Sequence, residues 1–265
     1  MHLATPSHAI VRPPSSSYAA CLREHPDPPI DIPLARTQHA GYVAALRDAG
    51  IVVDVLAEHD APDATFVEDT AIVLDTCALV TRPGARTRRA EVASIAAALE
   101  GRRTITIMPP PGTIDGGDVM RIGRHLVVGL SQRTDRAGAD ALAKVAATDD
   151  IRVITVDVPS GLHLKSACSV VTPELVVVHG ALGDALRRVL DPSIVLLAVP
   201  EPTGANVLGL GDRVLVSSAA PRTAELLVAR GLRVHTVELS QIHLGDGALS
   251  CLSLRFAPTA EAWCV

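Results

Sequence analysis

The stretch Glu68-Asp69-Thr70-Ala71-Ile72-Val73-Leu74 starts with two acids and continues as a short apolar run with β-branched residues. This pattern predicts a strand that opens with carboxylates. A hairpin leading to residues 78–81 follows, and then an Ala-rich segment over residues 89–99 that is typical of a helix. The stretch therefore begins a unit of two strands and a helix.

The same order of elements recurs further along the chain. Glu68 lies 47 residues before Asp115, which lies 48 residues before His163. Arg86 and Arg133 are again 47 residues apart. Further units begin near residues 205 and 244, and the strand at 9–11 with the helix at 38–49 can complete the last one. Such a small unit cannot bury its own apolar face, so several must close around a centre. The sequence predicts an α/β fold of five repeated units.

In a closed ring, the residue that opens each unit points toward the axis. The openers are Glu68 with Asp69, then Asp115, then His163. The fifth unit, LGDGALSCLSLRF over residues 244–256, places Cys251 after a Gly-Asp-Gly turn and at the start of an alternating, strand-like run. A cysteine alone is usually a small buried hydrophobe. Recurrence at matched positions instead predicts that acids, a histidine and a cysteine meet in one cleft.

The composition argues against several classes of protein. The 265 residues are 48% hydrophobic and carry a net charge of −5, which argues against nucleic-acid binding. No apolar stretch reaches the roughly 18 residues of a membrane span, and residues 1–14 lack the apolar core of a signal peptide. The five cysteines are scattered without a CxxC pair, so we expect a reduced cytoplasmic protein without a zinc site or a disulfide framework.

Residues 5–35 are rich in proline and serine and predict a mobile connecting loop. Long loops in compact domains also commonly serve as lids, and the sequence leaves both interpretations open.

A thiolate beside an imidazole suits attack on an electrophilic carbon whose leaving group needs a proton. Carboxylates around that pair would repel an anion and bind a cation. A planar guanidinium matches them best, through paired hydrogen bonds. A bound cation would also favour ionisation of Cys251.

At this point the motifs resemble the dimethylarginine dimethylaminohydrolases, a family of guanidino-group-modifying enzymes. The matching segments run through the chain in order: residues 66–71, 81–85, 115–119, 128–134, 162–166 and 246–251. The resemblance implies a five-bladed α/β propeller that forms one catalytic domain over residues 1–265. It also implies hydrolysis of asymmetric dimethylarginine and monomethylarginine to citrulline and an amine, without a metal or organic cofactor.

The resemblance also implies roles for single residues. Cys251 resembles the nucleophile, His163 the general acid and base, and Asp115 a carboxylate that holds the guanidinium or orients His163. The remaining expected substrate contacts are Glu68 and Asp69 for the guanidinium, Arg88 and Arg133 for the α-carboxylate, and Asp63 and the backbone near Asp246 for the amino group. Arg86 and Arg89 compete for the role of Arg88.

Two other functions stay open on the sequence alone. An arginine or agmatine deiminase uses the same scaffold, although this chain lacks room for an inserted helical domain. A non-enzymatic binding protein of the same architecture is the other alternative. The expected partner is a small guanidino molecule, with no nucleic acid and no membrane, and the protein is a monomer or a homodimer.

Overall fold

The computed structural model describes residues 6–159 and 161–257. Within these residues the strands form five sheets of three strands each. In every sheet a middle strand pairs antiparallel with one neighbour and parallel with the other. The sheets are β3(Ala71–Val73)-β4(Cys77–Val80)-β5(Thr104–Ile107), β6(Val119–Ile122)-β7(His125–Leu130)-β8(Arg152–Asp157), β9(Cys168–Thr172)-β10(Leu175–Val178)-β11(Val195–Ala198), β12(Leu208–Leu210)-β13(Arg213–Ser217)-β14(Arg233–Val237) and β15(Leu254–Phe256)-β1(His8–Val11)-β2(Val52–Val55). The five-unit α/β prediction is confirmed, including the last unit that is completed from the N-terminal side.

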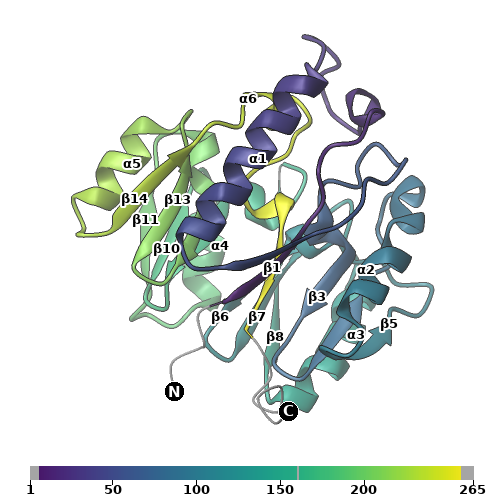
Figure 1. Ribbon diagram of the computed structural model, residues 1–265. Helices are drawn as coiled ribbons and strands as arrows, with labels where there is room; N and C mark the ends of the chain where they lie inside the picture. The colour runs from purple at the N-terminus through teal and green to yellow at the C-terminus, as the bar shows by residue number, and fades with distance from the viewer. Residues whose placement is uncertain (1–5, 160, 258–265) are drawn as a thin grey trace.

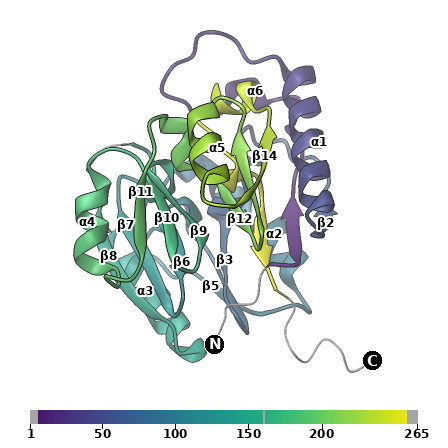
Figure 2. The same cartoon turned by 90° about the vertical axis from the view of Figure 1, so that its left-hand side faces the viewer.

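A helix joins the middle strand of each sheet to its parallel partner, because a parallel pair needs a crossover connection. These helices are α2(Val92–Leu99), α3(Arg136–Ala146), α4(Leu182–Val189), α5(Pro221–Val228) and α1(Ile32–Asp48), and a short α6(Ser240–His243) precedes the last unit. Figures 1 and 2 show how they cover the sheets: in Figure 2, α4 and α1 lie at opposite margins of the molecule with the strands between them.

Five buried apolar clusters hold the sheets together, and each cluster is shared by two neighbouring sheets. One cluster packs Leu79 of β4 against Leu126 of β7, and another packs Ile10 of β1 against Ala78 of β4. The largest joins α1 and β1 to Leu208 and Leu215 of the fourth sheet. The series of clusters returns to its start, so the five sheets form a closed ring.

A 3₁₀ turn immediately precedes the first strand of each sheet. These turns are η2(Val67–Thr70), η4(Gly116–Asp118), η6(Leu164–Ser166), η7(Pro202–Ala205) and η8(Ser250–Leu252). They contact one another in the order η8, η2, η4, η6, η7. Asn206, which ends η7, hydrogen-bonds to Ser250 of η8 and completes the circle. The openers of the repeat thus gather in one place, as predicted.

One local prediction was wrong, and two predicted helices are present but begin at other residues. Glu68, Asp69 and Cys251 lie on 3₁₀ turns and not on strands. The first helix begins at Ile32, six residues before the expected Gln38, because Asp31 caps it by accepting the Leu34 N–H at 2.9 Å. The helix predicted over 89–99 is instead η3(Arg86–Ala90) followed by α2.

The connection before α1 contains η1(Tyr18–Ala20), and η5(Ala147–Asp149) follows α3. Among the described helices, none is long and apolar enough to cross a membrane.

Candidate active site

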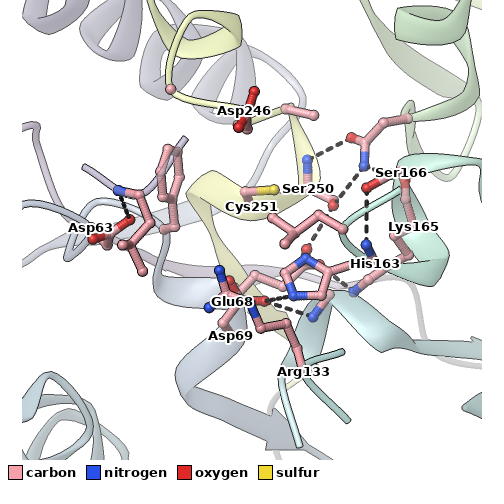
Figure 3. Close-up of a pocket in the computed structure, with 18 of the residues that line it drawn as sticks. Asp63, Glu68, Asp69, Arg133, His163, Lys165, Ser166, Asp246, Ser250 and Cys251 are labelled. Atoms are coloured by element: carbon pink, nitrogen blue, oxygen red, sulfur yellow. Dashed lines mark hydrogen bonds and ion pairs between the residues drawn. The ribbon is translucent and has the colours of Figure 1, made fainter. Parts of the chain in front are cut away.

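A pocket lies against the ring of 3₁₀ turns, and all but one of the residues predicted for the site line it (Figure 3). In that view the sulfur of Cys251 lies between the loop of Asp246 and the ring of His163. Asp115 is the exception: its side chain is fully buried behind His163. The lining side chains from the predicted set are Asp63, Glu68, Asp69, Arg88, Arg133, His163, Asp246 and Cys251.

Cys251 is half-buried on η8, and its N–H donates to the carbonyl of Ala248 at 3.2 Å. Burial raises the pKa of the Cys251 thiol to about 12, helped by the negative charges of Glu68 and Asp69, while Lys165 acts in the opposite direction. Without a ligand this side chain is therefore a neutral thiol at pH 7.

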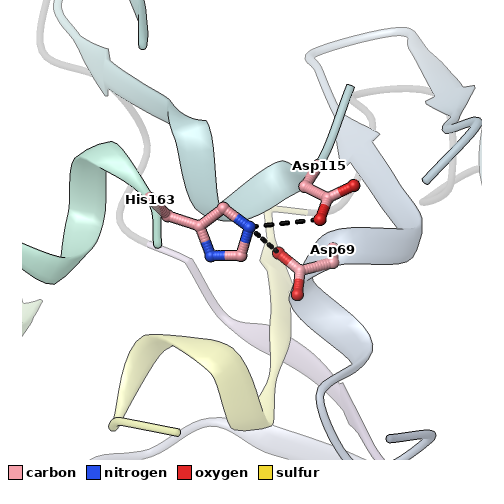
Figure 4. Close-up of side chains that lie close together, drawn as sticks. All are labelled: Asp69, Asp115 and His163. Atoms are coloured by element: carbon pink, nitrogen blue, oxygen red, sulfur yellow. Dashed lines mark hydrogen bonds and ion pairs between the residues drawn. The ribbon is translucent and has the colours of Figure 1, made fainter. Parts of the chain in front are cut away.

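His163 lies directly before η6, and one nitrogen of its buried ring faces two carboxylates, those of Asp115 and Asp69 (Figure 4). Its Nε2 is 3.1 Å from Oδ2 of Asp115 and 3.9 Å from Oδ1 of Asp69. Burial alone would lower the pKa of His163, but the charge of Asp69, the hydrogen bond to Asp115 and the charge of Asp118 raise it to about 9. The imidazole is therefore protonated at neutral pH and ready to donate a proton.

Gly117 allows this packing of His163 against Asp69. Its N–H donates to Oδ1 of Asp69 at 2.8 Å. A Cβ added at this position would lie 2.6 Å from Nδ1 of His163 and 2.9 Å from Oδ1 of Asp69. Only glycine fits here without displacing one of the two functional side chains.

Arg88 is the arginine of η3 that enters the site. Arg86 is exposed, and the Arg89 side chain turns back to the carbonyl of Pro83. Arg88 is 4% exposed and pairs with Asp69 at 2.5 Å and with Glu91 at 2.9 Å.

The Arg88 guanidinium has two consequences for the site. Burial would raise the pKa of Asp69, but the charges of His163 and Arg88 lower it to about 2, so Asp69 is ionised at neutral pH. Among the described residues, Nη1 of Arg88 hydrogen-bonds to Asp69 alone, which leaves its second N–H for a ligand.

Arg133 is a different kind of cation. It follows β7, is half-buried at the pocket, and has no side-chain hydrogen bond or ion pair to the residues that the structure describes. Its charge is therefore available to an anionic group of a ligand.

Asp63 and Asp246 are both engaged by the segment 21–24, which we call the strap. Oδ1 of Asp63 accepts the Leu22 N–H at 3.0 Å, and Oδ2 of Asp246 accepts the Glu24 N–H at 2.6 Å. The strap therefore lies over the part of the pocket where the substrate amino group was expected, near Asp63 and the backbone at Asp246, and Leu22 lines the pocket. This observation favours the lid interpretation of the Pro- and Ser-rich connection.

Glu68 is held by groups that sequence reasoning missed. Its Oε1 is 2.5 Å from Nζ of Lys165, and its Oε2 accepts the Ser250 hydroxyl at 2.7 Å. Asn206 supports this arrangement through two hydrogen bonds with Ser250 and one to the Lys165 carbonyl, each 2.9 Å long. Lys165 lies in the matched segment 162–166 and is one of only two lysines in the chain, a signal that could have identified it.

Asp118 is a second carboxylate that sequence reasoning missed. It is fully buried, accepts the Leu164 N–H at 2.8 Å and the Ser131 hydroxyl at 2.6 Å, and so fixes the turn that follows His163. Its position as the second acid of Asp115-Gly116-Gly117-Asp118 was the available signal.

Asp69, Asp115 and His163 offer donor atoms within 4.8 Å of one another, a spacing that suits a metal ion. The adjacent guanidinium of Arg88 and the raised pKa of His163 both oppose a bound cation, because a metal ligand must give up its proton. The cluster is better suited to holding a proton.

Comparisons with known proteins agree with this geometry. The family model described as Arginine deiminase matches residues 58–192. The N(G),N(G)-dimethylarginine dimethylaminohydrolase of Streptomyces coelicolor is 38% identical over 93% of this chain and 96% of the relative. The Pseudomonas aeruginosa enzyme of the same name is 30% identical over 94% of this chain and 99% of the relative. A solved structure of a Pseudomonas aeruginosa dimethylarginine dimethylaminohydrolase mutant (cysteine to serine), complexed with citrulline, gives a TM-score of 0.88 at 29% identity, over 95% of this chain and 100% of that one.

The fold, the cysteine and histidine in one pocket, and these relatives define a hydrolase that acts on carbon–nitrogen bonds. More narrowly, the chain belongs to the dimethylarginine dimethylaminohydrolase family.

Proposed function

We propose that this enzyme hydrolyses Nω-methylated arginines, namely asymmetric dimethylarginine and monomethylarginine, to citrulline and a methylamine. The observation that carries the proposal is the placement of Cys251 and His163 in one pocket, with Asp115 behind the imidazole. The names of the most similar relatives support the substrate class.

The pKa values suggest the order of events. The substrate guanidinium binds among the carboxylates, and its positive charge offsets the burial and anionic charges that keep the Cys251 thiol protonated. The thiol loses its proton to water and the thiolate attacks the guanidinium carbon. Protonated His163 then donates its proton to the methylated nitrogen, the C–N bond breaks, and a thiouronium on Cys251 remains.

The second half of the reaction uses neutral His163 as a base. It takes a proton from water and the resulting hydroxide adds to the thiouronium carbon. The C–S bond then breaks and the hydroxyl proton passes to the departing sulfur, which releases citrulline and regenerates the thiol. Asp115 acts in both halves by orienting the imidazole and stabilising its charged form, which its buried position behind the ring supports.

The remaining residues bind the substrate in this proposal. Asp69 faces the guanidinium. Glu68 lies beside Asp69 and acts through Lys165 and Ser250, which its carboxylate holds in place. Arg133, with the free N–H of Arg88, holds the α-carboxylate. Asp63 and Asp246 accept hydrogen bonds from the amino group once it displaces the N–H groups of the strap.

We also propose that residues 1–265 form one catalytic domain and that the ring of sheets is a five-bladed α/β propeller with the reaction near its axis. The shared topology of the five sheets and the circle of 3₁₀ turns support this description. No cofactor is required for the reaction as written, the partner is the small guanidino substrate, and the protein acts in the cytoplasm as a monomer or homodimer.

Arginine deimination is the second candidate, favoured by the family model that matches residues 58–192. A panel of dimethylarginine, monomethylarginine, arginine and agmatine separates the two, with citrulline and the released amine measured for each. We expect dimethylamine and methylamine from the first two compounds and little ammonia from arginine. Faster release of ammonia from arginine than of dimethylamine would overturn the proposal in favour of the deiminase, and a thiol at position 251 that no reagent alkylates would favour a binding protein.

A further inference from the structure

Both oxygens of the buried Glu68 carboxylate already have partners in the protein. The carboxylate therefore does not offer a guanidinium the pair of free acceptors that it prefers. Lys165 contacts one oxygen at 2.5 Å, with Arg255 more distant at 3.7 Å from the same oxygen, and the Ser250 hydroxyl donates to the other at 2.7 Å. Glu68 is 5% exposed and the Lys165 side chain 13% exposed, so water does little to weaken this pair. An acid expected to bind substrate is instead satisfied by the protein itself.

The pair lines the same pocket as the two reacting side chains, Cys251 and His163. Lys165 belongs to η6, two residues after His163, and Ser250 immediately precedes Cys251 (Figure 3). A nitrogen that receives a proton from His163, on a carbon attacked by Cys251, must lie between these two side chains. The surface that it meets there includes Lys165 and the occupied carboxylate of Glu68.

We propose that Lys165 is a specificity-determining residue that favours methylated over unmethylated guanidinium groups by occupying Glu68, an inference that rests on the proposed function. A dimethylated nitrogen has no N–H group, so it loses nothing against a carboxylate that is already satisfied. The unmethylated nitrogen of arginine has two N–H groups, and each one buried without an acceptor is costly. A free carboxylate at this position would accept them.

The charge of Lys165 repels both substrates alike, because both are cations. Discrimination therefore comes from the acceptor that Lys165 removes, and not from its charge. This distinction makes Glu68 essential to the effect: without its carboxylate, removing Lys165 provides no new partner for arginine.

The test compares kcat/KM for asymmetric dimethylarginine and L-arginine in the wild type and in Lys165→Met. We expect the preference for dimethylarginine to fall at least about tenfold, since discrimination by hydrogen-bonding groups commonly exceeds that value. Lys165→Arg, which can still pair with Glu68, should keep most of the wild-type preference. Lys144→Met changes the only other lysine, which is exposed on α3, and should leave the preference unchanged.

The second arm repeats Lys165→Met in a Glu68→Met background, in which position 68 offers no oxygen that could accept an arginine N–H. The proposal requires that the substitution no longer changes the preference there. If Lys165→Met lowered the preference for dimethylarginine equally in both backgrounds, the effect would belong to the charge or size of Lys165, and the proposal would be overturned. A preference that Lys165→Met leaves unchanged in the enzyme with wild-type Glu68 would also overturn it.

Binding measurements separate this inference from the proposed function. In Cys251→Ser, calorimetry gives the dissociation constants of both compounds without turnover, and Lys165→Met should tighten arginine relative to dimethylarginine about tenfold. Thermal melting of each variant confirms that it is folded. A wild type that acts on dimethylarginine with no change in either ratio would refute the inference alone, whereas a wild type that prefers arginine would refute the proposed function and with it the inference.

Discussion

Replacing Asp115 by Asn tests the electrostatic basis of the site. The pKa of His163 is raised from an ordinary 6.5 to about 9, which corresponds to about 3 kcal/mol in favour of the protonated ring. Asp115 contributes through a buried hydrogen bond of 3.1 Å, and a hydrogen bond to a charged group is worth about 1.5–3 kcal/mol. Asn fills the same space and can still accept the Gly84 N–H at Oδ1. It carries no charge to stabilise the imidazolium.

We therefore expect the pKa of His163 to fall by at least one, to about 8 or below, in Asp115→Asn. Above pH 8 the variant would hold its imidazole mostly neutral, so the decline of kcat/KM at high pH should begin at a correspondingly lower pH. NMR titration of the histidine resonance that disappears in His163→Gln measures the same pKa without turnover. Asp140→Asn, at an exposed position of α3, is the control. A resonance in Asp115→Asn that still titrates near pH 9 would refute the reasoning.

Four further predictions follow from the site. Cys251→Ser should abolish turnover without unfolding the protein. In the wild type, the rate of Cys251 alkylation by iodoacetamide should rise with pH up to about 12, the pKa of the thiol, and a rate that levels off near pH 8 would contradict this. Gly117→Ala should lower kcat at least about 100-fold, because the added Cβ would lie 2.6 Å from Nδ1 of His163. Gly41→Ala adds a Cβ in open space and should leave kcat unchanged, and equal kcat values for the two variants would exclude the steric argument. Arg133→Ala should lower kcat/KM for dimethylarginine roughly 30-fold to several thousand-fold, which corresponds to about 2–5 kcal/mol. It should not lower kcat/KM for agmatine, which lacks the carboxylate, and equal losses for the two substrates would remove Arg133 from the site. Because the pKa of His163 is raised, protonated His163 stabilises the fold fully below pH 6.5, and this stabilisation is lost as the pH rises through about 9. The free energy of unfolding measured with urea should therefore fall over that range in the wild type but not in His163→Gln.

The ring of sheets was predictable because its signals are local and repeated. Apolar periodicity marks the strands and helices of each unit, and an offset of 47 or 48 residues relates the first three units. The 3₁₀ turns were not predictable, since a short run such as residues 67–73 fits a turn and a strand equally well. The start of α1 was missed because residues 5–35 were assigned as a whole to a Pro- and Ser-rich loop, although a proline such as Pro33 is favoured in the first turn of a helix.

The site was predictable to the extent that each residue opened a unit or stood in a matched segment. The pairing of Glu68 with Lys165 joins residues 97 apart and has no signature in either neighbourhood. The choice among three nearby arginines also depended on how η3 turns, which places Arg88 inside and Arg86 outside. Long-range electrostatic pairs of this kind arise from packing, and a single sequence does not contain them.

The pairing of β15 with β1 joins residues that are 248 positions apart, His8 and Phe256. During synthesis the sheet of β1 and β2 must wait for its third strand until the ribosome has passed residue 256, because the chain emerges from its N-terminal end. Until then the apolar flanks of β1 and α1 lack their neighbours, and such a non-local contact slows folding. The same delay keeps the thiol of Cys251 apart from the acids and the histidine, so the enzyme has no assembled centre until its ring has closed.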